Sequence, residues 1–481
     1  MVKLVFLWTD ALLYVLVATV LLSAWYIRSH EHLRAPWREV LHSRLGVAAM
    51  VVLAAYVTIG LLDSVHFRMP AGGRAADGAE RYSGRVLSVL DLILTPLRTH
   101  EEETYSAPLA TRLYTKETVE LPDGRDVRIY PRLRYGGAQL RDPARERIPD
   151  ILHTVLRGAV FALVLWAALL ALVVARLARR HRWRVLHALY RVLSGRTEHP
   201  WNVALYTAGA LILFGSVTGH LAVHYHVFGT DKVGQDVFYE TLKSIRTGLV
   251  IGTLSTLVML PLAIVLGITA GYFRSWVDDV IQYLYTTLNS IPGVLLIAAA
   301  ILMLEVYMAN HPQNFQTVIA RADLRLLFLC IILGITSWTG LCRLLRGEAL
   351  KLRELDYIQA AQAFGVGHTK ILTRHILPNV MHIVLITVVL DFSGLVLAEA
   401  VLTYVGVGVD PTTYSWGNMI NGARLELARD PVVWWSLAAA FVFMFGLVLS
   451  ANLFADAVRD AFDPRSGTTR GPGSGRRDVG A

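Results

Sequence analysis

Long apolar runs recur along this 481-residue chain, separated by polar segments. A run of roughly 18 or more mainly apolar residues is long enough to cross a bilayer as an α-helix. Counting such runs, and admitting shorter ones with supporting flanks, predicts nine spans. They cover residues 4–26, 45–62, 158–175, 201–223, 248–270, 281–308, 326–341, 383–407 and 432–454. The pattern therefore predicts an all-α polytopic membrane protein.

Composition agrees with this class. The mean hydropathy is +0.47, with 54% hydrophobic and 17% charged residues, which is far from the average of soluble globular proteins. The first run could be mistaken for a signal peptide. It is too long, contains Asp10 and precedes no convincing cleavage site, so we interpret it as a retained span.

Two short arginine-rich loops, residues 28–44 and 176–196, set the expected orientation, because such loops stay in the cytoplasm. The N-terminus and residues 63–150 are then outside, and the C-terminal tail is inside. The net charge of +9 reflects this bias and contact with anionic headgroups. No pattern of interleaved bases and aromatics indicates nucleic-acid binding.

The outside segment, residues 63–150, is too long for a connector and predicts a small extracytoplasmic module. Residues 117–131 alternate apolar and polar positions around Pro-Asp-Gly, which predicts a β-hairpin. Residues 71–78 are expected to form a flexible linker. The Gly-rich tail, residues 466–481, is expected to be disordered and cytoplasmic.

A polar, amphipathic segment, residues 357–379, lies between two predicted spans. Ala360, Ala361 and Ala363 favour helix, Gly365 allows a turn, and Pro378 is expected to close a second short helix. The predicted shape is helix, turn, helix. Small side chains let another protein approach the backbone closely, so the segment suits docking better than catalysis.

This segment resembles the Glu-Ala-Ala, or EAA, loop of binding-protein-dependent ABC importer permeases, with Gln359 in place of Glu. The residues on the pattern are Ala360, Ala361, Gly365, Ile376, Leu377 and Pro378. Three further stretches, residues 226–238, 398–420 and 452–465, resemble motifs of the dipeptide/oligopeptide/nickel branch, specifically its C-type second permease subunit. The resemblance covers residues 201–465 and leaves about 200 residues unexplained.

The resemblance implies a type I ABC importer transmembrane domain, a six-helix core that forms half of a translocation pathway, with three extra N-terminal spans. The implied partners are a homologous permease, two cytoplasmic ATPase subunits and an extracytoplasmic substrate-binding protein. ATP and Mg would belong to the ATPase subunits, so this chain is expected to be no enzyme and to carry no cofactor. The implied location is the bacterial inner membrane, and the implied cargo is a di- or oligopeptide.

We therefore expect five parts. They are 1–62, two spans; 63–150, the module; 151–200, a third extra span and a basic loop; 201–465, the permease core with its coupling loop at 356–379; and 466–481, the tail. The residues expected to couple to the ATPase are Gln359, Ala360, Ala361, Gly365, Ile376, Leu377 and Pro378.

Two carboxylates inside a predicted span are candidates to line the pathway. Asp391 and Glu399 are eight residues apart, about two helical turns. An ionisable group in hydrocarbon costs about 2.5–3.5 kcal/mol, so something must compensate it. The alternative for each is a structural hydrogen bond or a carboxyl kept neutral by burial. Pro261 and Pro292 indicate kinks.

Other motifs point away from catalysis. Residues 365–370 lack the Gly-x-x-x-x-Gly-Lys-Ser/Thr spacing of a phosphate loop. Cys330 and Cys342 have no second ligand pair and are expected to be buried thiols. The histidine pairs at 30/32 and 224/226 have no accompanying ligand constellation for a metal. A non-transporting scaffold or sensor, a permease for nickel or another small solute, and an exporter remain as alternatives.

Overall fold

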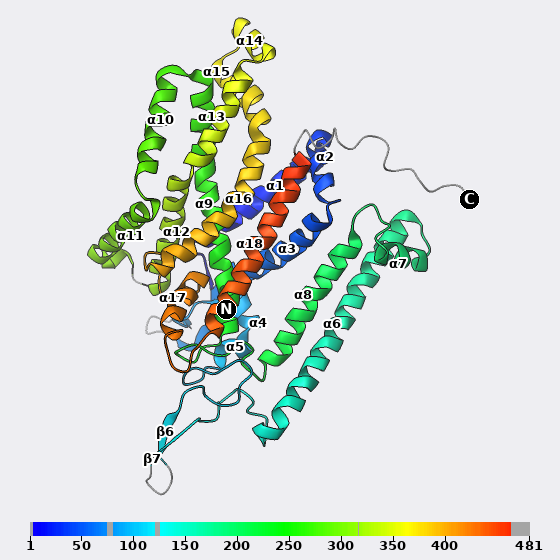
Figure 1. Ribbon diagram of the computed structural model, residues 1–481, viewed down its shortest axis with the longest axis vertical. Helices are drawn as coiled ribbons and strands as arrows, with labels where there is room; N and C mark the ends of the chain where they lie inside the picture. Colours follow the sequence, from blue (N-terminus) through cyan, green and yellow to red (C-terminus); the bar gives the residue numbers. More distant parts are fainter. Residues whose placement is uncertain (1–2, 75–79, 121–125, 316, 463–481) are drawn as a thin grey trace.

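The computed structural model describes residues 3–74, 80–120, 126–315 and 317–462. Its organising element is α9 (Val237–Phe273), a long helix with buried residues along most of its length. Asp236 caps this helix by accepting hydrogen bonds from the backbone N–H groups of Phe238 and Tyr239. Several of the other helices pack around α9, whereas α6 (Pro143–His181) and α8 (Trp201–Ala222) stand to one side of it (Figure 1).

Eight helices in the described ranges are long and apolar enough to cross a membrane. The sequence predicted nine, and the difference lies at residues 326–341. Helix α12 (Val318–Ser337) runs through most of this region, but its first turns carry Arg321, Asp323 and Arg325. These charges make it more polar than a lipid-facing span. The helix ends at Ser337, and α13 (Thr339–Arg353) follows directly.

The predicted single span at 281–308 is wrong, because Pro292 divides it into two helices. The first, α10 (Ser275–Ser290), ends before Ile291, whose backbone is extended. The second, α11 (Gly293–Asn310), begins after the proline. A proline disfavours helical geometry in the residue before it and cannot donate a backbone hydrogen bond, so the chain bends sharply here (Figure 1).

The N-terminal part contributes three more apolar helices. These are α1 (Trp8–Ser29), α3 (Arg44–Ser64) and α6 (Pro143–His181), with the amphipathic α2 (Glu31–Val40) between the first two. Helix α6 pairs with α8 (Trp201–Ala222), and the short α7 (Val185–Leu193) joins them. Gly158 of α6 allows this close approach, since a Cβ there would lie 2.9 Å from the backbone of Val217.

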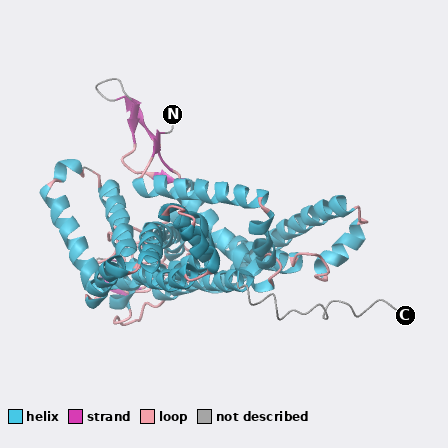
Figure 2. Cartoon of the chain, turned by 90° about the horizontal axis from the view of Figure 1, so that it is seen from above, coloured by secondary structure: helices cyan, strands magenta, loops and turns pink. Residues whose placement is uncertain are grey.

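The module between α3 and α6 contains short strands, as predicted. A three-stranded sheet has the order β1 (Lys3–Val5), β2 (His66–Arg68), β5 (Leu87–Ser88), so the beginning of the chain lies beside the end of α3. Strands β6 (Glu117–Glu120) and β7 (Asp126–Ile129) pair antiparallel and confirm the predicted hairpin, whose turn lies outside the described residues. Seen from above, strands near the N-terminus project beyond the helices (Figure 2).

The expected linker at 71–78 is wrong over its first residues. Residues 71–74 belong to β3 (Pro70–Arg74), which pairs antiparallel with β4 (Glu80–Tyr82) and has a shift of register between Pro70 and Arg74. Backbone hydrogen bonds to a neighbouring strand order a segment whose glycines alone indicated flexibility. Residues 75–79 and the predicted disordered tail at 466–481 lie outside the described residues. Two short helices, α4 (Val89–Ile93) and α5 (Thr95–Thr99), complete the region before the hairpin.

The C-terminal half of the chain contains the remaining helices. In order, these are η1 (Pro312–Asn314), α14 (Asp356–Ala363), α15 (His368–Ile371), the π-helix η2 (Leu372–Ile376), α16 (Leu377–Tyr404), α17 (Trp416–Glu426) and α18 (Trp435–Phe462). Figure 1 places α14 and α15 at one end of the molecule and the β6–β7 hairpin at the other. Helices α2 and α7 lie at those ends of their neighbouring helices that are on the same side of the molecule as α14.

Candidate functional site

The polar segment at 356–379 folds as the predicted helix, turn and second helix. Helix α14 ends where the N–H of Phe364 bonds to the carbonyl of Ala360, and Gly365 then adopts a positive φ of 73°. This conformation favours glycine. The backbone N–H of Val366 bonds to the carbonyl of Ala361 and completes the turn. The sequence signal at Gly365 therefore corresponds to a real constraint of the backbone.

The prediction for Pro378 is wrong, because this proline does not end a helix. Instead the chain stays helical from α15 through η2 into α16, and Pro378 lies in the first turn of α16. In η2 the backbone N–H of Leu377 bonds to the carbonyl of Leu372, five residues back. This wider turn lets the chain continue past a proline that lacks the usual donor.

One face of the segment is anchored in the protein. Ile358, Ile371 and Ile376 are fully buried in a core shared with the C-terminal half of α9 and with α13. Ile376, predicted to take part in ATPase coupling, therefore holds the segment in place and presents no surface to a partner. Leu377 is only half-buried.

Tyr272, near the end of α9, is a polar hub beneath this segment. Its side chain is buried, and its hydroxyl lies 2.8 Å from Nδ1 of His368 and 3.3 Å from Nε2 of Gln362. Its carbonyl accepts a hydrogen bond of 2.7 Å from Arg353. Both halves of the helix-turn-helix are thus tied to one position on α9. Sequence reasoning missed Tyr272, because nothing local marks it.

The opposite face is open. Gln359, Ala360, Gly365 and Pro378 are exposed, and Ala361 is half-buried. The side chain of Phe364 is 88% exposed and that of Tyr357 is 45% exposed. We call this face, made by Tyr357, Gln359, Ala360, Phe364 and Gly365, the outer loop face. Exposed aromatic groups beside small residues on a rigid support are typical of an interaction surface.

The two predicted pathway carboxylates have different surroundings. Glu399 is buried in α16, and its Oε1 accepts a hydrogen bond of 2.8 Å from the Thr403 hydroxyl. It also lies against the start of α17, since a Cβ on Gly417 would come 2.8 Å from that oxygen. Asp391 is half-buried and has no hydrogen-bond or ion-pair partner among the described residues. No hydrogen bond links the two side chains, and each has its own surroundings within the described residues.

At the other end of the molecule, the loop 226–236 is hydrogen-bonded to the segment 102–106. The backbone N–H of Glu102 donates to the Gly234 carbonyl, and the hydroxyl of Thr230 donates to the Thr104 carbonyl. Gly234 has a φ of 79°, and a Cβ there would lie 1.8 Å from the Glu102 carbonyl oxygen. The glycine in this motif is therefore required for contact with the N-terminal module.

His226 lies at the centre of this contact and is buried. Its Nδ1 is 2.7 Å from Asp236, and its Nε2 is 3.3 Å from Glu102. Burial opposes protonation of the imidazole, but the hydrogen bonds to both carboxylates outweigh it and raise the pKa of His226 to about 9. Burial likewise opposes ionisation of Glu102. Hydrogen bonds from His226 and three backbone N–H groups lower its pKa to about 2.

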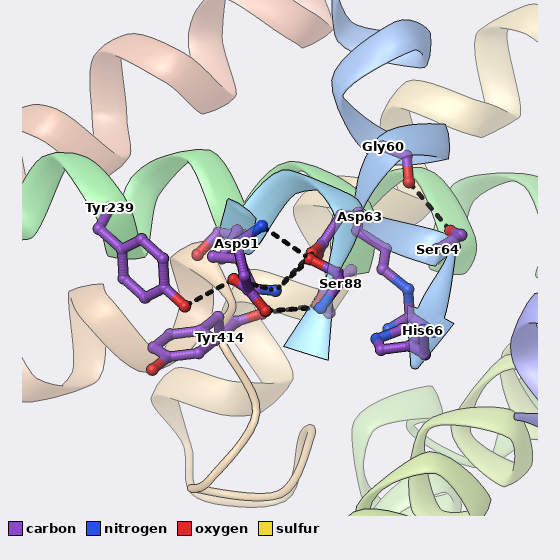
Figure 3. A network of polar contacts seen from close by, with 12 residues as sticks. Gly60, Asp63, Ser64, His66, Ser88, Asp91, Tyr239 and Tyr414 are labelled. Carbon is purple, nitrogen blue, oxygen red and sulfur yellow. Dashed lines mark hydrogen bonds and ion pairs between the residues drawn. The ribbon is translucent and has the colours of Figure 1, made fainter. Parts of the chain in front are cut away.

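A second polar network joins the N-terminal part to α9 (Figure 3). Lys243 of α9 forms ion pairs with Asp63 at the end of α3 and with Asp91 of α4, the latter at 3.1 Å. Arg246, one turn further, pairs with Asp10 of α1 at 2.5 Å. The N-terminal carboxylates thus neutralise two cations of the predicted core. Sequence reasoning singled out Asp10 alone, because charge pairing between distant segments leaves no local signal.

The cysteine and histidine side chains that were candidates for redox or metal chemistry have structural surroundings. Cys330 and Cys342 are both free and buried, which confirms the expectation of buried thiols. Within the described ranges, no group of three or more His, Cys, Asp or Glu side chains could hold a metal ion. His226 uses both ring nitrogens in contacts to carboxylates.

Comparison with known proteins gives a consistent family. Residues 263–467 match the family described as binding-protein-dependent transport system inner membrane component. A glutathione transport system permease protein of Pectobacterium atrosepticum is 31% identical over 242 residues, which cover 50% of this chain and 73% of that protein. A dipeptide transport system permease protein of Lactococcus lactis is 30% identical over 241 residues, covering 50% of this chain and 64% of that protein. An oligopeptide transport system permease protein of Mycobacterium tuberculosis is 29% identical over 245 residues, covering 51% and 78%.

Proposed function

The chain belongs to the family of binding-protein-dependent transport system inner membrane components, and from this premise we propose that it is a permease subunit of an ATP-driven peptide importer. The chain would form half of a translocation pathway. A homologous permease would form the other half, two ATPase subunits would bind at the cytoplasmic face, and an extracytoplasmic binding protein would deliver the cargo. ATP and Mg would be bound by the ATPase subunits.

The observation that carries this proposal is the outer loop face. Its residues are exposed, while Ile358 and Ile371 on the opposite side are fully buried. A surface that is apolar, exposed and rigidly supported fits a groove on a partner subunit. Because Tyr272 ties both halves of the segment to α9, a push on the loop would move α9 with it. Movement driven by ATP in the partner could therefore reach the spans.

The orientation supports the same assignment. The arginine-rich segments around α2 and α7 lie at helix ends that point toward the side of α14 (Figure 1). Short basic loops remain in the cytoplasm, so the outer loop face would meet cytoplasmic ATPase subunits. The N-terminus and the module at 63–150 would then be extracytoplasmic, and the C-terminus cytoplasmic. This orientation requires α12 and α13, which both pack against α9, to make one further crossing together besides the eight apolar helices. We keep the division into residues 1–62, 63–150, 151–200, 201–465 and 466–481 as part of the proposal.

The proposed cargo is a di- or oligopeptide. Relatives named for dipeptide, oligopeptide and glutathione transport all carry peptide cargo by name. Within the pathway, Asp391 is the better candidate to meet cargo, because it has no partner among the described side chains. Glu399 is held by Thr403 and would position the loop before α17.

The test replaces single residues of the outer loop face. Ala360→Asp places a charge on the exposed surface, and Phe364→Ala removes its largest apolar side chain. Both variants should insert normally but lose most peptide uptake and most copurifying ATPase, since a charge or a lost anchor weakens a packed interface. Uptake of labelled peptide and recovery of the ATPase on an affinity resin are the measurements.

Gly365→Val and Gly347→Val form a matched pair for the same test. A Cβ at either position meets nothing within 4 Å in this chain, but only Gly365 lies on the outer loop face and has a positive φ. Gly365→Val should uncouple ATP hydrolysis from uptake, whereas Gly347→Val should behave like the unmodified chain. Normal uptake by the Ala360, Phe364 and Gly365 variants would mean that the outer loop face does not couple the chain to the ATPase. A scaffold or sensor that does not transport would instead be favoured if peptide uptake did not depend on the unmodified chain.

A further inference from the structure

A cavity of about 590 Å³ lies between the N-terminal part and the core, beside the network in Figure 3. Its walls come from the end of α3, residues 84–101, the first half of α9, the start of α12 and the loop 412–414. This volume falls within the range of about 300–1,000 Å³ typical of small-molecule sites. We call it the charged cavity, because acidic and basic side chains line it in similar numbers.

Some of the charged side chains in and behind this lining already form ion pairs with one another. Lys243 is paired with Asp63 and Asp91, and Arg246 with Asp10. Burial alone would raise the pKa of Asp91, but Lys243 and hydrogen bonds from Ser88 and Tyr239 hold it below its usual value. These groups already satisfy one another, so they fix the shape of the wall and leave little charge for a ligand.

Three other charges in the lining are unmatched. Arg85, Arg98 and Glu101 have no side-chain hydrogen bond or ion pair within the part of the chain that the structure describes. The Nε of Arg98 is buried and without a partner. A buried donor that is left unpaired lowers stability, so Arg98 gains from any acceptor that enters the cavity.

Polar groups from the core line the same cavity. The Tyr414 hydroxyl accepts a hydrogen bond of 2.9 Å from the Gln235 amide and still has its own proton to donate. Glu101 lies close enough to Tyr414 to act on it electrostatically. Both the N-terminal part and the core therefore supply donors and acceptors to the same open cavity, in which Arg98 is half-buried and Arg85 and Glu101 are exposed.

We propose that the charged cavity binds a short peptide with free termini, its carboxylate at Arg98 and Arg85 and its ammonium group at Glu101. Unmatched cations and an unmatched carboxylate in one cavity select a zwitterion. A polyphosphate would meet the Asp63, Asp91 and Asp323 carboxylates as well. The inference rests on the proposed function for the choice of a peptide. Arg85, Arg98 and Glu101 all precede the matched family region, so the N-terminal part supplies the selective groups.

The test measures binding without the binding protein. The full chain in nanodiscs is titrated calorimetrically with trialanine, with its N-acetylated form and with its C-terminal amide. Trialanine should bind, and each blocked form should bind about tenfold more weakly, because each loses a charge-assisted hydrogen bond; tenfold corresponds to about 1.4 kcal/mol. Arg98→Gln should abolish the difference between acid and amide. Glu101→Gln should abolish the difference between the free and acetylated amine.

Arg145→Gln and Glu103→Gln are matched controls, since both side chains are exposed and neither lines the cavity. They should leave all three affinities unchanged. No binding of trialanine at millimolar concentration, or full discrimination retained in both cavity variants, would overturn the proposal. Peptide uptake by the assembled transporter is measured in parallel. Uptake without binding sinks the cavity proposal alone, whereas binding without uptake supports it and sinks the importer function.

Discussion

His226 shows how one residue can carry information that the sequence hides. In the sequence it is one of two histidines spaced two apart, and metal binding was the chemistry to weigh. In the structure it bridges Asp236 of its own loop and Glu102 of the N-terminal module. Because Glu102 is 124 positions away, no local pattern could reveal the pair. The glycines at 229 and 234 gave the better signal, since their positive φ values fit the close approach of residues 102–106.

At this scale we predict a pH-dependent contribution of His226 to stability. Its pKa is about 9 in the folded chain and about 6.5 when unfolded, so its contribution is complete below pH 6.5 and disappears as the pH rises through 9. His226→Gln should lower the free energy of unfolding by on the order of 3 kcal/mol at pH 6, and by much less above pH 9. Thermal unfolding of the purified protein at pH 6 and pH 9.5 measures the difference.

Two comparisons make that prediction specific. His153→Gln replaces an exposed histidine and should leave the unfolding temperature unchanged at both pH values. Glu102 contributes in the opposite range, because its lowered pKa of about 2 means that its effect is lost only as the pH falls from about 4.5 toward 2. Equal destabilisation by His226→Gln at pH 6 and pH 9.5 would mean that packing, and not charge, accounts for the residue.

At the scale of elements, the apolar pattern predicted most spans, and the exceptions have physical causes. Pro292 divides one predicted span because hydropathy counts side chains and ignores the missing backbone donor. Helix α12 begins among charges because Asp323 accepts hydrogen bonds from the backbone N–H groups of Trp8 and Thr9 at the start of α1. Such compensation depends on a helix far away in sequence. The helix-turn-helix was predictable, since its glycine and alanines act locally.

The contact between α3, α4 and α9 yields the second prediction. Lys243→Met leaves the buried Asp63 and Asp91 without their cation and should cost about 3–5 kcal/mol of stability. Adding Asp63→Asn and Asp91→Asn removes the unpaired charges and should restore part of that loss. Unfolding temperatures of the single and triple variants give the comparison. Lys351→Met is the control, because its pair with Glu348 is exposed and contributes little.

A triple variant no more stable than Lys243→Met would contradict this account. The loss would then arise from the packing of the lysine chain against α3 and α4, and the ion pairs would be incidental. Recovery in the triple variant would instead mean that the N-terminal part is held to α9 mainly by matching charges. Such an attachment is specific, because a wrong partner leaves buried charges unpaired.

At the scale of the whole molecule, the N-terminal part is integrated into the core. It supplies carboxylates to Lys243 and Arg246, it clasps the loop 226–236, and Tyr56 of α3 donates a hydrogen bond of 2.8 Å to the Phe443 carbonyl of α18. The sequence indicated a boundary near residue 200, because the family motifs begin after it. The motif boundary marks where resemblance to relatives begins. The contacts that stabilise the molecule cross this boundary, so it does not separate two independently packed parts.

This difference leads to the last prediction. A chain limited to residues 201–481 keeps the family motifs but loses Asp10, Asp63 and Asp91, so Lys243 and Arg246 would face hydrocarbon or a polar void unpaired. An unpaired cation within a span costs about 2.5–3.5 kcal/mol or more. The shortened chain should therefore accumulate poorly in membranes, and Lys243→Met with Arg246→Met should raise its level several-fold. The same double change in the full chain should lower the level, because it strands the three carboxylates. Immunoblots of the membrane fraction compare the four proteins.

The contradicting outcome is that the shortened chain, without the two methionine substitutions, accumulates as well as the full chain. The N-terminal part would then be an accessory to a core that is stable by itself, and charge matching would not hold the molecule together.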